Sequence, residues 1–295
     1  MFRRLYAKWL AWRGKTVDTY SKDNQSVACS KESSCDYGSP KHEKLTFTIN
    51  GVSFDMVLVK AGTFTMGATP EMEDPLDDEK PVHQVTLTND YYIGKTEVTQ
   101  ALWKAVMGKR AVEPSFLGKL FGAEVTYKDD NPSDFKGDNK PVEQVSWDDC
   151  QIFVRKLNAA TGKNFRLPTE AEWEFAARGG NKSKNFKYSG SDNIDDVAWY
   201  VANSGDTTQD VATKRPNELG VYDMSGNVWE WCSDWHGDYS SSAQTNPTGA
   251  KSGSCRVFRG GSWSWLAWNC RSSTRGYNSP GSRNYFLGLR LALSE

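Results

Sequence analysis

The first clear pattern along the chain is an alternation of apolar and polar residues on both sides of Asn50-Gly51. The flanking segments 45–49 and 52–59 are rich in β-branched and aromatic residues, and Asn-Gly is the dipeptide that a two-residue hairpin turn favours. The sequence therefore predicts two antiparallel strands joined by a tight turn. Residues from about 14 to 43 show no such periodicity and are rich in polar residues and Gly, which indicates a flexible linker ahead of the domain.

Three later segments carry apolar residues at helical spacing. Thr96, Ser146 and Thr169 are their predicted N-caps, because Ser and Thr side chains accept hydrogen bonds from the first amides of a helix. In the third segment, Glu172 follows Thr169 at the spacing of a capping box. The faces that we expect to be buried in the first two helices are Leu102, Trp103, Val106 and Met107, and Cys150, Phe153, Val154 and Leu157.

The glutamates of the third helical segment raise the question of acid–base chemistry. Glu170 and Glu174 lie one helical turn apart, so we expect them to pair with Arg166 or Arg178 instead of acting in catalysis. The acidic stretch from 71 to 80 lacks the ligand spacing of a calcium loop and predicts a solvated surface loop.

Composition narrows the classes of function. Thirty-six Lys and Arg residues against 37 Asp and Glu give a formal net charge of −1, so nucleic-acid binding through phosphate neutralisation has no support. No apolar run reaches the roughly 18 residues of a membrane-spanning helix, and we expect no transmembrane segment. The 12 Trp and 25 Gly residues are typical of a loop-rich fold with an aromatic core. We also expect the protein to be a monomer.

The N-terminal segment 1–15 begins with basic residues, but Lys8 and Arg13 interrupt its apolar positions, so it does not match a secretory signal. Its apolar residues share one face at helical spacing and predict a short helix, which either docks on the domain or contacts a membrane interface. That face contains Phe2, Leu5, Tyr6 and Trp9.

The six cysteines fall into no zinc-binding spacing. They are Cys29, Cys35, Cys150, Cys232, Cys255 and Cys270. The sequence does not decide between disulfides, such as Cys232 with Cys255 or Cys270, and buried free thiols.

Ordered motifs run through most of the chain. They include Arg-Leu-Pro-Thr-Glu-Ala-Glu-Trp-Glu at 166–174, Gly-Asn-Val-Trp-Glu-Trp-Cys at 226–232, Arg-Val-Phe-Arg-Gly-Gly-Ser-Trp at 256–263 and Gly-Leu-Arg at 288–290. Together they resemble the formylglycine-generating enzyme (sulfatase-modifying factor) family. The resemblance implies an α+β, C-type-lectin-like fold with short antiparallel strands, a few helices and much irregular loop. It would form one domain over 44–295, after an N-terminal helix and linker over 1–43.

The resemblance bears directly on catalysis. Family members that oxidise a sulfatase cysteine carry two active-site cysteines that bind copper, and the positions here are Trp265 and Cys270. Thiolates are the soft ligands that hold Cu(I), and one Cys beside an indole cannot supply two, so we expect no copper. Ser262 matches a family active-site Ser but lacks a neighbouring base, since the nearest His in sequence is His236. We therefore expect no catalytic residues, although the sequence leaves an enzymatic function as an alternative.

The resemblance also implies a structural calcium site. In the family, the stretch equivalent to 222–230 binds calcium through a side-chain oxygen, two backbone carbonyls and a terminal Glu. The matching residues are Asp223, Gly226, Val228 and Glu230. Ca²⁺ accepts such mixed oxygen ligands, whereas the alternative is that Asp223 and Asn227 satisfy turn amides.

The region 256–295, called the tail below, places residues of every chemical kind between fixed motif positions. This layout resembles the variable proteins of diversity-generating retroelements, which carry their mutable residues in the C-terminal region of this fold. A mixture of Trp, Tyr, Ser, Gly and Asn is also typical of antibody paratopes. The residues that we expect to bind ligand are Ser264, Trp265, Leu266, Trp268, Asn269, Thr274, Gly276, Tyr277, Asn278, Ser279, Ser282, Asn284, Tyr285 and Phe286.

The sequence thus favours a non-catalytic, receptor- or adhesin-like variable protein that binds an unknown protein or cell-surface ligand. Display on a cell surface is implied by the resemblance alone. One alternative is an oxidase of the family that acts on the cysteine of a sulfatase-like protein. The other is a fixed structural envelope protein. The alternative to a diversified tail is an ordinary family tail with aromatic core residues, and Trp265 and Trp268 bear on this choice. Neither Trp can arise from an Asn codon by adenine changes alone.

Overall fold

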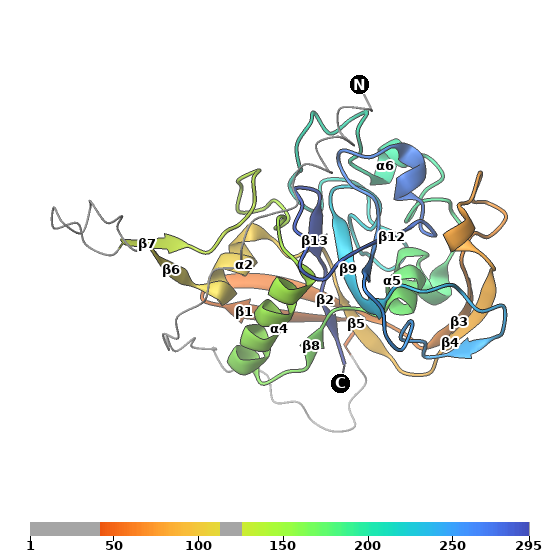
Figure 1. Cartoon of the computed structure of the whole chain (residues 1–295), viewed down its shortest axis with the longest axis horizontal. Helices are drawn as coiled ribbons and strands as arrows, with labels where there is room; N and C mark the ends of the chain where they lie inside the picture. Colours follow the sequence, from red (N-terminus) through yellow and green to blue (C-terminus); the bar gives the residue numbers. More distant parts are fainter. Residues whose placement is uncertain (1–41, 113–125, 295) are drawn as a thin grey trace.

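The computed structural model describes residues 42–112 and 126–294 (Figure 1). The predicted N-terminal helix, and nearly all of the predicted linker up to residue 43, lie outside the described residues. Within them, no helix combines the length and apolar character needed to cross a bilayer.

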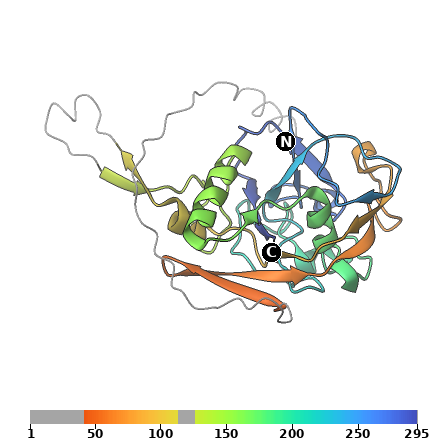
Figure 2. The same ribbon diagram turned by 90° about the horizontal axis from the view of Figure 1, so that it is seen from below.

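The predicted hairpin is the first element of the domain. Strand β1 (Lys44–Ile49) pairs antiparallel with β2 (Val52–Val59). Asn50 and Gly51 turn the chain with φ angles of 48° and 82°, the left-handed backbone that a type I′ turn requires and that Asn and Gly tolerate. The hairpin prediction is confirmed, and Figure 2 shows the two strands along one edge of the molecule.

The hairpin belongs to a five-stranded sheet that joins the two ends of the described chain. Its order is β1-β2-β5-β14-β8, with β5 at Tyr91–Gly94, β14 at Ala292–Leu293 and β8 at Phe165–Arg166. Because β14 pairs antiparallel with both β5 and β8, the last described residues lie inside the sheet that the first strands begin.

A four-stranded sheet carries the tail. Its order is β12-β11-β9-β13, with β9 at Trp229–Trp235, β11 at Arg256–Arg259, β12 at Arg275–Asn278 and β13 at Leu287–Leu289. Figure 1 shows this sheet at the centre, with helices α2 and α4 on one side and α5 on the other. Three of its strands come from the tail, so the tail is built into the domain.

The remaining elements are short. A three-stranded sheet consists of β3 (Gly62–Met66), β4 (His83–Leu87) and β10 (Gln244–Thr245), and β6 (Lys109–Val112) pairs with β7 (Thr126–Asp129). The helices are α2 (Gln100–Met107), α4 (Trp147–Thr161), α5 (Glu170–Ala177) and α6 (Ile194–Val197), with 3₁₀ turns η1 (Asp77–Glu79), η2 (Gly180–Lys182) and η3 (Ala267–Cys270).

The predicted caps hold for two of the three helices. Ser146 accepts a hydrogen bond from the Asp149 N–H at the start of α4, and Thr169 accepts one from the Glu172 N–H at the start of α5. The prediction for α2 is wrong by three residues, because Thr99 and not Thr96 is its cap. The Val98 N–H donates to the carbonyl of Leu289 in β13, and this pairing keeps the chain extended past Thr96.

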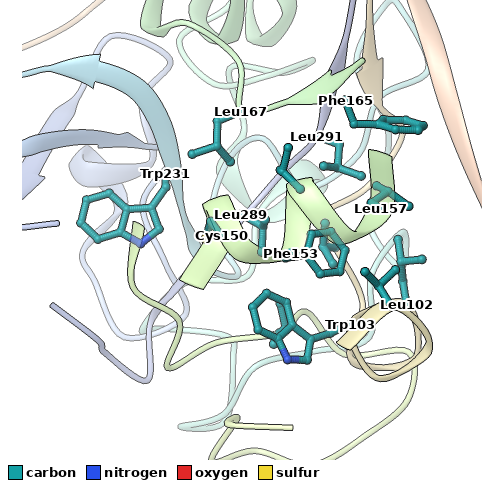
Figure 3. Close-up of a cluster of buried hydrophobic side chains, with 14 of the residues drawn as sticks. Leu102, Trp103, Cys150, Phe153, Leu157, Phe165, Leu167, Trp231, Leu289 and Leu291 are labelled. Atoms are coloured by element: carbon teal, nitrogen blue, oxygen red, sulfur yellow. The ribbon is translucent and has the colours of Figure 1, made fainter. Parts of the chain in front are cut away.

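The main core lies between α2, α4 and the two larger sheets (Figure 3). Trp103 of α2 stacks on Phe153 of α4, with ring centroids 5.0 Å apart and planes 2° from parallel. Every residue of the two predicted buried faces is buried, so those predictions are confirmed. Cys150 is one of these core residues, and Cys150, Cys232, Cys255 and Cys270 carry free thiols.

Candidate ligand-binding surface

Buried arginines fix the tail to the rest of the domain. Arg259 contacts Glu170 at 2.8 Å and Glu174 at 2.6 Å, and Arg275 contacts Glu170 at 2.6 Å. Burial opposes ionisation of Glu170, but Arg275 and Arg259 outweigh it and lower its pKa to about 2. Removing one partner from such a buried pair leaves an uncompensated charge. These contacts therefore hold β11 and β12 against α5.

The predicted partners of the α5 glutamates need correction. Glu174 does pair with Arg178, at 2.9 Å, but Glu170 pairs with neither of the arginines expected for it. Arg166 instead forms a two-pronged pair with Glu172, at 2.6 and 2.7 Å. Glu170 faces the tail because it is the first residue of α5, on the side where β11 and β12 pass.

The acidic loop 71–80 is also part of the tail's support. Glu79 is fully buried, contacts Arg271 at 2.6 Å and accepts a hydrogen bond from the Ser273 hydroxyl. Arg271 also donates to the backbone carbonyl of Glu73 at 2.9 Å. The prediction that the whole loop is solvated surface is therefore wrong at Glu79, which is buried by residues that come from the tail.

Two further arginines complete the anchoring. Arg283 contacts Asp149 near the start of α4 at 2.7 Å, and Arg290 contacts Glu230 of β9 at 2.7 Å. In all, Arg259, Arg271, Arg275, Arg283 and Arg290 each pair with a carboxylate that lies outside the tail. The tail backbone is thus fixed at intervals by these ion pairs.

The segment around η3 exposes large apolar side chains. Trp265, Leu266 and Trp268 are 37%, 39% and 41% exposed, and Val201 beside them is 39% exposed. The Val201 N–H donates to the carbonyl of Trp265 at 3.0 Å, which joins the two segments. We call Val201, Trp265, Leu266 and Trp268 the tryptophan patch. Val201 was not predicted, since it lies in a segment without periodicity that no sequence signal connects to the tail.

Aromatic rings continue from the tryptophan patch into the domain. Trp265 lies edge-on to Trp229 at 5.7 Å and to Phe286 at 5.8 Å, and Phe286 contacts Tyr285 at 5.3 Å. Tyr285 in turn lies 5.6 Å from Trp263. Phe286 and Tyr285 are half-buried, so these predicted ligand residues form the inner border of the tryptophan patch, and Trp265 has a fixed orientation.

Tyr277 faces away from this patch. In β12 its neighbour Gly276 pairs with Phe258, whose ring contacts Trp229 at 5.1 Å on the patch side of the sheet. Successive side chains of a strand point to opposite faces, so Tyr277 lies on the other face. It is 51% exposed and stacks on His236, with ring centroids 3.9 Å apart. The predicted ligand residues are therefore divided between two faces.

Three predicted ligand residues have supporting roles instead. Asn269 and Thr274 are buried, and the Thr274 hydroxyl donates to the carbonyl of Trp268 at 2.9 Å. A Cβ atom at Gly276 would lie 2.0 Å from the ring of Phe258. None of the three offers a side chain to a ligand, so the prediction that they contact the ligand is wrong for these positions. The remaining smaller positions, Ser264, Asn278, Ser279, Ser282 and Asn284, are at least partly exposed.

Of the two residues that correspond to the family's copper-binding cysteines, only Cys270 carries a thiol. Cys270 is fully buried, and burial raises the pKa of its thiol to about 12. Trp265 fills the other position with its ring against Trp229. Ser262 is buried, and its hydroxyl lies 3.4 Å from that of Ser264. A serine hydroxyl cannot act as the base that Ser262 would need as a nucleophile.

The predicted calcium ligands fit the ion only in part. Asp223 uses Oδ2 to accept from the Ala212 N–H at 2.7 Å, and its Oδ1 is buried without a partner among the described residues. Glu230, in contrast, already accepts from both Arg290 and the Trp173 indole. In the part of the chain that the structure describes, no group of three or more His, Cys, Asp or Glu side chains could hold a metal. Calcium therefore stays a prediction that depends on Asp223 and backbone carbonyls.

Short antiparallel strands, a few helices and long irregular segments closed by a C-terminal strand define an α+β, C-type-lectin-like fold. The chain belongs to the family of the sulfatase-modifying factor enzyme 1-like domain, whose model matches residues 48–295. The fold and the family predicted from the motifs are confirmed.

Three relatives illustrate the range of this family. The chain is 36% identical over 262 residues to chaperone protein LppX of Paenibacillus barcinonensis, covering 72% of this chain and 79% of the relative. It is 33% identical over 285 residues to a formylglycine-generating enzyme of Streptomyces coelicolor, covering 80% and 88%. Among solved structures, Treponema denticola variable protein 1 matches with a TM-score of 0.72 and 33% identity, over 86% of this chain and 100% of that chain.

Proposed function

We propose that this chain is a non-catalytic binding protein whose tail presents the tryptophan patch to a protein or cell-surface ligand. The observation that carries the proposal is the exposure of Trp265, Leu266 and Trp268 on a backbone that buried arginines hold in place. A cluster of exposed aromatic and aliphatic side chains on a folded domain marks an interaction site. The likeness to Treponema denticola variable protein 1 supports a tail that varies between copies of the gene.

The anchoring arginines explain how such a tail could vary without unfolding. Arg271 and Arg275 contact carboxylates through guanidinium groups that are nearly free of solvent. The exposed tail residues, among them Trp265, Leu266 and Tyr277, lie outside the buried stretch from Arg271 to Arg275. Substitution at an exposed position away from special contacts changes stability by less than about 0.5 kcal/mol, so many tails are compatible with one scaffold. Preorganisation of the backbone also reduces the entropy lost on binding.

The aromatic residues and the small residues would have different roles in this surface. Trp265 and Trp268 supply large, rigid contact area, and Trp265 is oriented by Trp229 and Phe286. Ser264 precedes Trp265 in the chain and Asn284 precedes Tyr285, and both would supply adaptable hydrogen bonds. We therefore propose a fixed aromatic centre with a variable polar border.

The test of diversification is to sequence the 3′ end of the gene and its flanking DNA from many independent isolates. We expect substitutions at exposed positions such as Ser264, Leu266, Tyr277 and Asn284, and a near-copy of the segment nearby. Gly276, which is closed in by Phe258, should not change. An invariant tail without a near-copy would contradict the proposal and favour a fixed structural protein.

A second experiment separates binding from catalysis. The purified chain is incubated with copper, oxygen and a Cys-x-Pro-x-Arg peptide, with the Streptomyces coelicolor relative as the positive control. We expect no aldehyde product from this chain, because its Cys270 thiol is buried and Trp265 occupies the position of the first active-site cysteine. Formation of formylglycine above the level without enzyme would establish an oxidase instead.

A further inference from the structure

Arg256 is the one arginine of the described tail that a carboxylate does not neutralise. Its guanidinium lies between two indoles, 3.4 Å from the ring centroid of Trp235 and 4.0 Å from that of Trp147. Its Nη1 donates to the carbonyl of Ser233 at 2.6 Å. Both faces of the planar group are covered, so Arg256 has one orientation and presents only its edge.

The hydrogen-bonding capacity of this edge is not used up. The Nε of Arg256 is buried and has no hydrogen-bond partner among the described residues, and no Asp or Glu of that part of the chain lies within ion-pair distance of it. The side chain as a whole is half-buried. A guanidinium prefers to donate side by side to two oxygens of one planar or tetrahedral anion.

Two acidic residues lie near enough for their charges to act on Arg256. Asp234 uses Oδ2 to accept from the Glu170 N–H at 3.0 Å and from the Ser233 hydroxyl at 2.9 Å. Asp148 is exposed in the first turn of α4. Burial lowers the pKa of Arg256, and these two acids only oppose that effect. Neither acid forms an ion pair with Arg256 among the described residues, and an arginine side chain is always protonated in proteins.

We propose that Arg256, held between Trp147 and Trp235, is a recognition point for an oxoanion: a carboxylate, or a sulfate or phosphate group. Arg256 pairs across the sheet with Asn278, whose polar side chain lies on the same face of β12 and β11 and can complete the anion's hydrogen bonds. This assignment goes beyond the tryptophan patch and does not depend on whether the tail is diversified.

The test follows the arginine Nε–H resonances of the ¹⁵N-labelled full chain by NMR while sodium sulfate, sodium phosphate or sodium acetate is added. Sodium chloride at matched ionic strength serves as the reference. We expect a saturable shift of the Arg256 resonance with an oxoanion and a small, linear shift with chloride. Saturation with acetate indicates a carboxylate ligand, and saturation with sulfate or phosphate alone indicates a tetrahedral anion.

Arg215 is the internal control, because it is an exposed arginine that contacts Asp196 at 3.7 Å. The Arg256→Met variant keeps an apolar chain between the indoles and should bind the anion about tenfold more weakly or not at all. If the variant does not fold, the titration of the natural chain still shows whether Arg256 binds an oxoanion in preference to chloride. Equal behaviour of Arg256 in oxoanion and chloride, or equal saturation of Arg215, overturns the assignment and leaves the proposal for the tryptophan patch untouched.

Discussion

The ring of Phe258 fills the space that a side chain at position 276 would need. Gly276 lies opposite Phe258 in the pairing of β12 with β11, and a Cβ atom there would lie 2.0 Å from the ring. Phe258 cannot easily move, because Trp229 and Trp231 contact it edge-on at 5.1 and 5.4 Å. An aromatic ring that covers a glycine of the neighbouring strand is a recurrent way to stabilise such a pair.

We expect Gly276→Ala to destabilise the fold by about 1–3 kcal/mol, the cost of forcing extra atoms into a packed core. Gly281→Ala is the matched control, since a Cβ at Gly281 meets nothing within 4 Å, and it should change the free energy of unfolding by less than about 0.5 kcal/mol. Urea unfolding of both variants measures the difference. Equal stability of the two would show that position 276 is open to variation after all.

Breaking the ion pair of Arg271 with Glu79 should lower the free energy of unfolding by more than Gly276→Ala does. Arg271→Met would leave the carboxylate of Glu79 buried without its cation, and breaking one partner of a buried pair costs about 3–5 kcal/mol. Arg215→Met removes an exposed arginine whose partner, Asp196, is also exposed, and should cost no more than about 1 kcal/mol.

Thermal or urea unfolding measures both arginine variants. The double variant Arg271→Met with Glu79→Gln should regain part of the loss, because no buried charge remains unpaired. If Arg271→Met is no more destabilised than Arg215→Met, Arg271 is not an anchor of the tail.

Local signals in the sequence were sufficient for several elements. Asn50-Gly51 encodes its own turn, and Ser146 and Thr169 cap their helices with contacts only three residues away. Thr96 and Thr99 are chemically equal as caps. The choice between them depends on a hydrogen bond from Val98 to a strand near the end of the chain, which no local pattern contains.

The candidate site could be predicted only in outline for the same reason. The arginines that hold Glu170 lie 89 and 105 residues away from it, so a rule about helical neighbours chose the wrong partners. The motifs delimit the tail that contains Trp265 and Trp268, but the sequence left open whether these side chains are exposed or belong to the core. The burial of Thr274, the closure of Gly276 by Phe258 and the approach of Val201 to Trp265 all depend on packing between distant segments.

The buried side chain of Glu143 should make the free energy of unfolding depend on pH. Its side chain accepts from the Phe135 N–H at 2.9 Å, while its second oxygen is buried without a partner in the described structure. Burial, opposed by the hydrogen bond from Phe135 and assisted by the charge of Asp134, raises the pKa of Glu143 to about 7. A raised carboxyl pKa means that the folded state binds the proton more tightly than the unfolded chain. The stabilisation from protonated Glu143 is therefore present at low pH and is lost as the pH rises through about 7.

We expect Glu143→Gln to remove this loss, because the amide stays neutral and can still accept from Phe135. The free energy of unfolding of the variant should fall less than that of the natural chain between roughly pH 5 and 8. Asp206→Asn, a substitution at an exposed acid, is the control and should leave the pH profile unchanged. Identical profiles for Glu143→Gln and the natural chain would mean that Glu143 does not titrate in this range.

Calcium is tested most directly through Asp223. The Oδ1 atom of Asp223 has no hydrogen-bond partner within residues 42–112 and 126–294. If this atom and the nearby backbone carbonyls bind the ion, Ca²⁺ stabilises the folded state by mass action, by about 2.7 kcal/mol at a free concentration 100 times the Kd. The melting temperature should then rise with Ca²⁺ and fall with a chelator, whereas Mg²⁺, which demands a tighter octahedral site, should have little effect. Asp223→Ala should abolish the response to Ca²⁺. A melting temperature that changes with neither Ca²⁺ nor chelator would mean that this member of the family keeps the loop without the metal, with Glu230 paired to Arg290.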